Sequence, residues 1–264
     1  MVNVLESAQR HRCELLKPCA PNPGQPPFIL LPGMDGTAQL QHGQARQLAD
    51  AFDVRCLTIP GNDLSSWDDL TEQVLQLIEM EFSSATGQIY LLGESFGGCL
   101  ALKLALRSPR LFQRLILVNP ASSFERATLI RWGSHLTQWL PGILYPYSCL
   151  SILPFLAALN RMSDEGRWAL FSAMQSVSHR SAQWRLSLLH NLNVSDYHLR
   201  RISMPTLIVA SGCDRLLPSV DEARRLESLI APAQTYLLPQ SGHACLLEET
   251  VSIRRILQQC DFMP

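Results

Sequence analysis

Short apolar runs alternate with longer segments of mixed polarity over the first 120 residues of the chain. Four mainly apolar runs have the composition of strands buried in a parallel sheet, at residues 28–31, 54–59, 89–92 and 115–118. The segments between and after them have the pattern of helices, at residues 38–52, 67–83 and 99–106. This alternation predicts a parallel sheet covered by helices on both faces, which is the α/β class.

The alternation stops after residue 121 and returns near residue 204. Between these two points we find helical segments, four of the five tryptophans and no strand-like run. Beyond them the pattern predicts strands at residues 205–210 and 236–238, and helices at residues 219–230 and 245–260. The division into domains follows: an α/β core of residues 28–121 and 204–264, interrupted by a helical lid of residues 122–203.

Residues 1–27, which precede the core, are expected to form an arm on the surface of the domain. A short helix fits residues 4–16, and the prolines between residues 18 and 27 then break regular structure. Residues 1–12 contain no apolar core of the signal-peptide type.

The composition excludes several classes of protein. Apolar residues are 47% and charged residues 17%, so a large core is expected. The net charge of −1 and the lack of a basic block argue against a nucleic-acid partner. The eight cysteines form no C-x-x-C pair and no His/Cys cluster with zinc spacing. We therefore expect reduced thiols, a cytoplasmic location, and neither a metal nor another cofactor.

A G-x-S-x-G motif stands between a predicted strand and a predicted helix, in Gly93-Glu94-Ser95-Phe96-Gly97. In such a turn the serine has a strained backbone and its Oγ is exposed at the top of the sheet. The helix that follows directs its positive dipole end toward the serine. The motif favours Ser95 as a nucleophile over the alternative, an ordinary glycine-rich turn.

A serine hydroxyl needs a base, and the base needs a third group to fix its tautomer. Asp214 and His243 each lie just beyond a later predicted strand, in the order Ser, acid, His that this motif requires. Alone, Asp214 could be a turn residue and His243 a surface histidine. Together they favour a triad of Ser95, Asp214 and His243. Asp221 and Glu248 fall inside predicted helices, so we do not expect either to orient the histidine.

The tetrahedral intermediate of acyl transfer needs hydrogen-bond donors for its oxyanion. The N–H of Phe96, the residue after the nucleophile, is the first candidate. The N–H of Met34 is the second, in the loop after the first predicted strand, and a plain turn is the alternative for that loop. Asp35 in the same loop has three open roles: a helix cap, a contact with the polar end of the substrate, or none in catalysis.

Five blocks of the sequence carry a resemblance to a known family: L-P-G-M-D-G-T at 31–37, G-E-S-F-G-G-C-L-A-L at 93–102, N-P-A-S-S-F at 119–124, A-S-G-C-D-R-L-L-P-S at 210–219 and S-G-H at 241–243. They resemble the esterase/lipase/thioesterase family of photosynthetic organisms, which includes the phytyl ester synthases. The resemblance spans residues 28–260 and is looser over 125–200. It implies an α/β-hydrolase fold with a helical lid, and Ser95, Asp214 and His243 as the triad.

The resemblance also implies a chemistry: acyl transfer from acyl-CoA, acyl carrier protein or a galactolipid to a lipid alcohol such as phytol or diacylglycerol. The plant members carry a second, acyltransferase-like domain with an H-x-x-x-x-D motif. None of the histidines here has an aspartate five positions later. Hydrolysis of acyl esters or thioesters and acyl transfer therefore both stay open.

The lid suggests a lipophilic substrate. Residues 132–160 contain no Asp, Glu, Lys or Arg, but Pro141, Pro146 and Pro154 would break a membrane-spanning helix. We expect this stretch to line an acyl pocket and to contact the surface of an internal membrane; packing of the lid onto the core is the alternative. Two other functions remain open on the same fold: a small-ester carboxylesterase or C–C bond hydrolase, and a non-catalytic binding protein, against which the triad argues.

Overall fold

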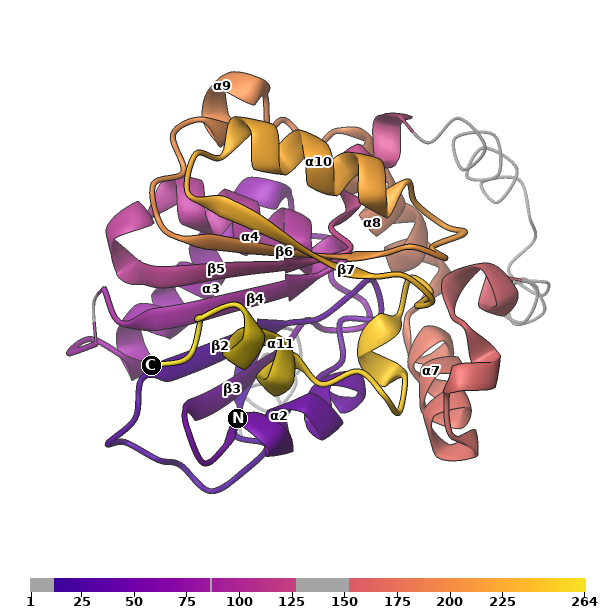
Figure 1. Ribbon diagram of the computed structural model, residues 1–264, viewed down its shortest axis with the longest axis horizontal. Helices are drawn as coiled ribbons and strands as arrows, with labels where there is room; N and C mark the ends of the chain where they lie inside the picture. Colours follow the sequence, from indigo (N-terminus) through magenta and orange to yellow (C-terminus); the bar gives the residue numbers. More distant parts are fainter. Residues whose placement is uncertain (1–11, 86, 127–151) are drawn as a thin grey trace, which may run out of the picture.

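The computed structural model describes residues 12–85, 87–126 and 152–264 (Figure 1). The strands of these residues are β1 (Glu14–Leu16), β2 (Pro27–Leu31), β3 (Asp53–Thr58), β4 (Ile89–Glu94), β5 (Phe112–Val118), β6 (Thr206–Ser211) and β7 (Ala233–Leu238). They form a seven-stranded sheet in the order β1-β3-β2-β4-β5-β6-β7. Only the β1–β3 pair is antiparallel among these neighbours, so the predicted α/β class with a mostly parallel sheet is confirmed.

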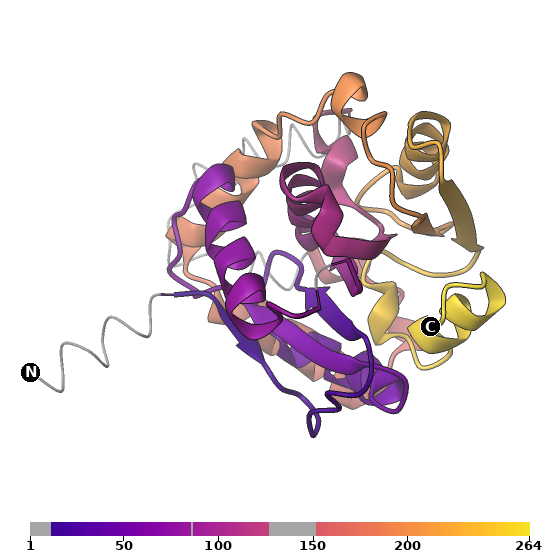
Figure 2. The same cartoon turned by 90° about the vertical axis from the view of Figure 1, so that its left-hand side faces the viewer.

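Helices cover both faces of the sheet. The labelled helices of the described residues are α2 (His42–Leu48), α3 (Trp67–Glu81), α4 (Phe96–Arg107), α7 (Asp164–Ser176), α8 (His179–His190), α9 (Asp196–Leu199), α10 (Ser219–Leu229) and α11 (Ile253–Gln259). Short 3-10 helices are η1 (Gln39–Gln41), η2 (Pro109–Leu111), η3 (Ala121–Arg126), η5 (Leu159–Arg161) and η6 (Cys245–Leu247). Residues of α3, α4 and α10 join one apolar cluster, and residues of α2 and α11 join another. Figures 1 and 2 show α10 and α11 on opposite sides of the sheet.

The alternation of side chains along β2 explains these two clusters. All five residues of β2 are buried, as expected for a parallel strand covered on both faces. Ile29 and Leu31 join the cluster under α3 and α4, whereas Phe28 and Leu30 join the cluster under α2 and α11. Successive side chains of a strand point to opposite faces, so one short apolar run supplies both cores.

The start of α3 follows the sequence closely. The Oγ of Ser66 accepts a hydrogen bond from the Asp69 N–H at 3.1 Å, and the Asp69 carboxylate accepts one from the Ser66 N–H at 3.3 Å. This reciprocal pair is a capping box, which satisfies donors that the first turn of a helix leaves free.

The prediction of a helix over residues 4–16 is wrong for the described residues 12–16. Residues 14–16 form β1, which pairs with β3 at the edge of the sheet, Glu14 opposite Thr58. An unpaired β3 would expose a row of backbone donors and acceptors, and β1 satisfies them. Residues 1–11 of the expected arm lie outside the described part of the chain.

The expected helix over residues 245–260 is also wrong, because it is interrupted between η6 and α11. The side-chain amide of Gln44 donates to the carbonyls of Leu246 and Val251 at 2.9 Å each and accepts from the Ile253 N–H at 2.9 Å. This buried glutamine occupies backbone groups that a continuous helix would pair internally. The helix expected at 38–52 is similarly shortened, to η1 and α2.

In the part of the chain that the structure describes, the segment between β5 and β6 consists of helices joined by loops. It contains η3, a helical turn at residues 152–156, and η5, α7, α8 and α9, without a strand among these residues. Much of the uncharged stretch 132–160 falls in residues 127–151, which are outside the described residues. In the described ranges, none of the helices has the length and apolar character needed to span a bilayer.

Candidate active site

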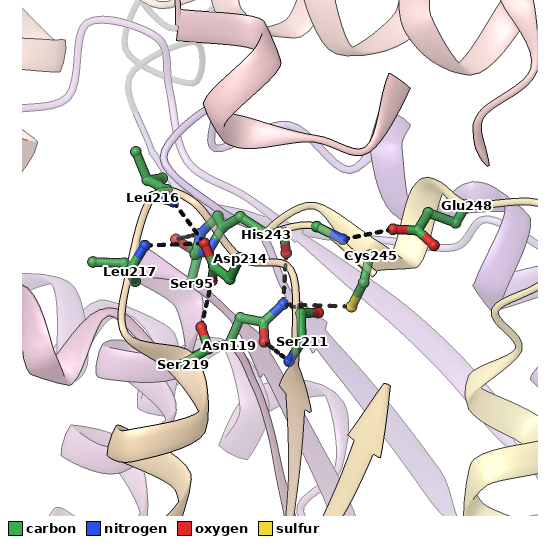
Figure 3. A network of polar contacts seen from close by, with 11 residues as sticks. Ser95, Asn119, Ser211, Asp214, Leu216, Leu217, Ser219, His243, Cys245 and Glu248 are labelled. Carbon is green, nitrogen blue, oxygen red and sulfur yellow. Dashed lines mark hydrogen bonds and ion pairs between the residues drawn. The ribbon is translucent and has the colours of Figure 1, made fainter. Parts of the chain in front are cut away.

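The carboxyl ends of three parallel strands bring the predicted catalytic side chains to one place (Figure 3). Ser95 follows β4 directly, and Asp214 and His243 lie in the loops after β6 and β7. In an open α/β sheet, this edge is where ligands bind, because the loops from neighbouring strands converge there. The structure therefore brings together the residues that the sequence predicted as nucleophile, acid and base.

A chain of hydrogen bonds joins the three side chains. The Oγ of Ser95 lies 2.8 Å from Nε2 of His243, and Nδ1 of His243 lies 2.7 Å from Oδ2 of Asp214. The side chains of His243 and Asp214 are only 3% and 1% exposed. This geometry places a base within proton-transfer distance of a hydroxyl and a carboxylate behind the base.

The backbone at Ser95 is strained, as the motif predicts. Its φ of 53° and ψ of −112° are unfavourable for a residue with a Cβ. The two glycines of the motif are required by close contacts: a Cβ on Gly93 would lie 2.2 Å from the Gly97 carbonyl oxygen, and one on Gly97 would lie 2.5 Å from that of Leu31. These contacts seat the first turn of α4 against the ends of β2 and β4.

Asp214 is held in its charged form. Its Oδ1 accepts hydrogen bonds from the N–H groups of Leu216 and Leu217 at 2.8 and 2.9 Å, and the Ser219 hydroxyl donates to Oδ2. Burial opposes ionisation, but the charge of His243 and these hydrogen bonds outweigh it and lower the pKa of Asp214. A carboxylate in this state can stabilise a positive imidazole.

The same contacts act on His243 in the opposite sense. Burial alone would lower the pKa of His243, but the charge and hydrogen bond of Asp214, together with the charge of Glu94, raise its pKa. The imidazole is therefore a stronger base than an ordinary histidine. Its backbone is also fixed, because the carbonyl of His243 accepts a hydrogen bond from Nδ2 of Asn119 at 2.7 Å.

The two candidate oxyanion donors lie on adjoining segments. Phe96 is the first residue of α4, so its N–H is one of the donors that has no acceptor inside the helix. Met34 lies in a tight turn closed by a 3.1 Å hydrogen bond from the Gly36 N–H to the Gly33 carbonyl. Gly36 has a φ of +71°, which favours glycine there. The contact of Gly97 with the Leu31 carbonyl brings the two segments together.

Asp35 has local bonds in the same turn. Its Oδ2 accepts from the N–H of Thr37 at 2.8 Å and from the Thr37 hydroxyl at 2.6 Å. Burial raises the pKa of Asp35, and these hydrogen bonds and the charge of Arg185 oppose that rise. These bonds form a local turn before η1, whose N-cap is Ala38, so Asp35 does not cap that helix; a contact with the substrate and no role in catalysis stay open.

Asn119 is a site residue that the sequence analysis left without a role. It is fully buried directly after β5, with a φ of 42°. Its Nδ2 donates to the Ser211 Oγ at 2.9 Å, and its Oδ1 accepts from the Ser211 N–H at 2.8 Å. It thus joins the ends of β5 and β6 to the backbone of His243. The sequence signal that could have identified Asn119 is its position just beyond a strand, the same signal that pointed to Asp214.

Glu94, the residue before Ser95, is a second site residue to which the sequence analysis gave no role. Its Oε1 is buried and has no hydrogen-bond partner among the described residues. Burial raises the pKa of Glu94 to about 7, although the charge of His243 lowers it and that of Asp35 adds to the rise. The sequence signal that could have drawn attention to Glu94 is the presence of a charged residue directly before the serine of the motif.

The described residues contain no cluster of three or more His, Cys, Asp or Glu side chains that could hold a metal ion.

Comparisons with known proteins agree with this fold. The sequence pattern of the alpha/beta hydrolase fold matches residues 26–250. Phytyl ester synthase 1, chloroplastic, of Arabidopsis thaliana is 31% identical in an alignment of length 257, which covers 88% of this chain and 36% of that protein. The pimeloyl-[acyl-carrier protein] methyl ester esterase of Nitrosomonas europaea is 25% identical, over 84% of this chain and 90% of that protein.

Among solved structures, MenH from S. aureus has a TM-score of 0.75 and 20% identity, over 95% of this chain and 97% of that chain. At this identity the likeness is one of fold. The chain spans about a third of the length of the two plant phytyl ester synthases that it matches, 36% and 37%.

Proposed function

Since the chain belongs to the α/β-hydrolase fold family, we propose that it is a serine-dependent enzyme acting on lipophilic acyl esters or thioesters through an acyl-enzyme on Ser95. By their names, its relatives include phytyl ester synthases, methyl ester esterases and putative carbamate hydrolases. The observation that carries the proposal is the hydrogen-bonded chain from Ser95 through His243 to Asp214, at 2.8 and 2.7 Å. Its geometry is that of a nucleophile, a base and an orienting acid.

The first half of the reaction forms the acyl-enzyme. The Oγ of Ser95 attacks the carbonyl carbon of the ester or thioester, and its proton passes to Nε2 of His243. The carbonyl π electrons move to the oxygen, which the N–H groups of Phe96 and Met34 stabilise as an oxyanion. The negative Asp214 stabilises the imidazolium that forms. When the tetrahedral intermediate collapses, the leaving alcohol or thiol takes its proton from His243.

The second half of the reaction removes the acyl group. His243 takes a proton from a water molecule or from an acceptor alcohol, whose oxygen attacks the acyl carbon, and Ser95 recovers its proton as the C–Oγ bond breaks. Water gives hydrolysis and a lipid alcohol gives transfer. The same residues serve both outcomes, so the acceptor decides between them.

The lipophilic substrate class is supported by the residues packed against the His243 loop. The Ala244 N–H donates to the Leu156 carbonyl at 2.8 Å, and a Cβ on Gly242 would lie 2.5 Å from the backbone nitrogen of Ala158. An apolar segment therefore lies directly beside the base. It borders a surface groove of about 460 Å³, where Phe155 is 50% exposed and whose other side is polar, with Arg161 and Arg215.

The acyl donor we propose is an acyl-CoA, an acyl carrier protein thioester or a galactolipid. One relative is a methyl ester esterase that by its name acts on an acyl-carrier-protein ester, and this supports the carrier-bound donors. The lid of residues 122–203 is proposed to enclose the acyl chain and to contact an internal membrane surface while the enzyme itself stays cytoplasmic. Both plant relatives are chloroplastic by name.

The test is a series of p-nitrophenyl esters from acetate to dodecanoate, with kcat/KM measured for each. The proposal predicts a rise toward longer chains, because each buried methylene contributes about 0.8 kcal/mol. A flat profile or an optimum at acetate would favour a small-ester hydrolase. Adding phytol or diacylglycerol to the same assay, with chromatography of the products, separates transfer from hydrolysis.

A further inference from the structure

Arg185 on α8 is a buried cation bonded to the loop that carries Met34. The residue is 1% exposed. One guanidinium nitrogen, Nη1, donates to the Met34 carbonyl at 2.6 Å, and the other, Nη2, donates to the Pro60 carbonyl at 2.8 Å. Burying a cation is costly, so a planar fork that satisfies two backbone carbonyls at once is a specific arrangement.

The turn around Met34 is built over this guanidinium. A Cβ on Gly36 would lie 2.7 Å from Nη1 of Arg185 and 2.8 Å from the Ile59 carbonyl oxygen. The Gly36 carbonyl in turn accepts from the Ile59 N–H at 2.8 Å. The turn is therefore held between the end of β3 on one side and Arg185 on the other, with no room for a side chain at Gly36.

The same helix reaches the other candidate oxyanion donor by a second route. The carbonyl of Leu188 accepts a hydrogen bond from Nε1 of Trp67 at 2.7 Å. The indole of Trp67 stacks on the ring of Phe96, with 4.7 Å between ring centroids and 22° between planes. Helix α8 thus contacts, through Arg185 and through Trp67, the residues on both sides of the expected oxyanion position.

Helix α8 is itself anchored along its length. The Ser178 N–H at its start donates to the Gly61 carbonyl at 3.0 Å, and Nε1 of Trp184 donates to the Ser65 carbonyl at 2.9 Å. Figure 1 shows α8 at the end of the sheet where the strands terminate. Although the sequence assigns it to the lid insertion, its contacts are those of a fixed wall of the core.

Resting on the proposed function, we propose that Arg185 is a positioning residue for the reaction: its bond to the Met34 carbonyl fixes the turn so that the Met34 N–H is directed at the oxyanion. The carbonyl and the N–H of Met34 share one Cα, so holding the first restricts the φ and ψ that orient the second. An oxyanion donor contributes only when it is held in place before the charge develops. Arg185 therefore acts in the transition state and not in substrate binding.

A purely structural role for Arg185 makes different predictions. If the residue only fills space and satisfies carbonyls, its loss should lower stability and leave the kinetics of the folded fraction unchanged. If it positions Met34, kcat falls while KM stays nearly constant, since the lost interaction exists only in the transition state. The two roles are therefore separable in the folded protein.

The experiment compares Arg185→Met and Arg185→Lys with Arg180→Met, which removes an exposed arginine from the same helix. For Arg185→Met we expect kcat on a p-nitrophenyl ester to fall roughly 10²-fold, the size found for one oxyanion donor, with KM within about threefold. Arg185→Lys keeps the charge but cannot donate to both carbonyls with the geometry of a guanidinium, so its kcat should lie between those of the wild type and Arg185→Met. Arg180→Met should match the wild type.

A trifluoromethyl ketone gives the second readout. Ser95 adds to its carbonyl, the proton passes to His243, and the new alkoxide occupies the oxyanion position. Its inhibition constant should rise in Arg185→Met by about the same factor as kcat falls. Binding of the unreacted ester, measured in a Ser95→Ala background with and without Arg185→Met, should not change.

The outcomes separate this inference from the function it rests on. An Arg185→Met protein that folds, confirmed by circular dichroism, and keeps wild-type kcat and ketone affinity would overturn the positioning role. If Arg185→Met does not fold, an unchanged kcat in Arg185→Lys would overturn it equally. Loss of activity in Arg180→Met as well would also contradict it. Lack of esterase activity in the wild type would instead reject the proposed function.

Discussion

The Oε1 of Glu248 accepts a hydrogen bond from the N–H of Gly242 at 2.8 Å, one residue before His243. Its Oε2 accepts from the Ser241 hydroxyl at 2.9 Å and from Nε of Arg161 at 2.5 Å. Glu248 thus fixes the backbone of the loop, whereas Asp214 bonds the imidazole itself. Two buried carboxylates near one histidine have different tasks, and mutation should separate them.

We predict that Asp214→Asn lowers kcat by about 10³- to 10⁴-fold and leaves the fold intact, because an amide cannot hold the reactive tautomer or stabilise the imidazolium. Glu248→Gln should lower the melting temperature and reduce kcat far less. Steady-state kinetics with thermal melts of both variants provide the check. A larger kcat loss in Glu248→Gln than in Asp214→Asn would mean that the acid is misassigned.

Asn119→Ala should lower both stability and kcat. The change leaves the Ser211 hydroxyl and N–H and the His243 carbonyl without their partner, at a cost of about 1–3 kcal/mol for each buried group left unpaired. Asn191→Ala, at an exposed helix end, is the matched control. Chemical denaturation and turnover should be measured together. Equal stability of the two variants would contradict the role of Asn119.

Glu94→Gln should move the pH profile. The acidic limb of kcat/KM reports ionisation of the free base, and the pKa of His243 lies above the ordinary value of 6.5. Because the Glu94 charge helps to raise that pKa, its removal should shift the limb to lower pH. Glu79→Gln on the exposed side of α3 is the control. A limb that stays in place, or moves to higher pH, would show that Glu94 does not act on the histidine.

The stability of the same variant should depend on pH. The folded pKa of Glu94 is about 7 against an ordinary 4.5, so the native state binds more protons between these values. Stability of the wild type is therefore lost as pH rises through that interval. Glu94→Gln removes this loss. The variant should be more stable than the wild type by roughly 3 kcal/mol near pH 8, with little or no gain from this source near pH 4. Denaturation at both pH values tests the sign.

A charge beside the His243 loop should change substrate preference. Phe155→Glu places a carboxylate in the groove next to the apolar residues 156–158, so kcat/KM for long acyl chains should fall more than that for acetate. Trp168→Glu changes an exposed aromatic residue of α7 outside that groove and serves as the control. The comparison is kcat/KM against acyl length. An equal loss at all lengths would place the acyl chain elsewhere.

The convergence of the candidate catalytic residues was predictable because each follows a strand whose apolar run is local in sequence. Ser95, Asp214 and His243 could be placed at one sheet edge without knowing the contacts between them. Asn119 obeys the same rule, and only the lack of an obvious chemical role hid it. The fold class was predictable for the same reason, since β2, β4, β5 and β6 are short apolar runs.

The remaining features depend on contacts between distant residues. The break before α11 arises from Gln44, some two hundred positions earlier, and no helical periodicity reveals it. Glu248 therefore looked like a helix residue although it fixes the His243 loop. Arg185 is similar: on an amphipathic helix it reads as a surface charge, and only the fold shows it under the Met34 turn.

The central claim is a covalent acyl group on Ser95, and rapid-quench mass spectrometry tests it most directly. Wild-type protein is mixed with p-nitrophenyl decanoate and quenched in acid during turnover, beside Ser95→Ala and the exposed-serine control Ser228→Ala. We predict a mass increase of one decanoyl group, mapped to the peptide containing Ser95, in the wild type and in Ser228→Ala. The same adduct and turnover in Ser95→Ala, or its location on another residue, would contradict the account.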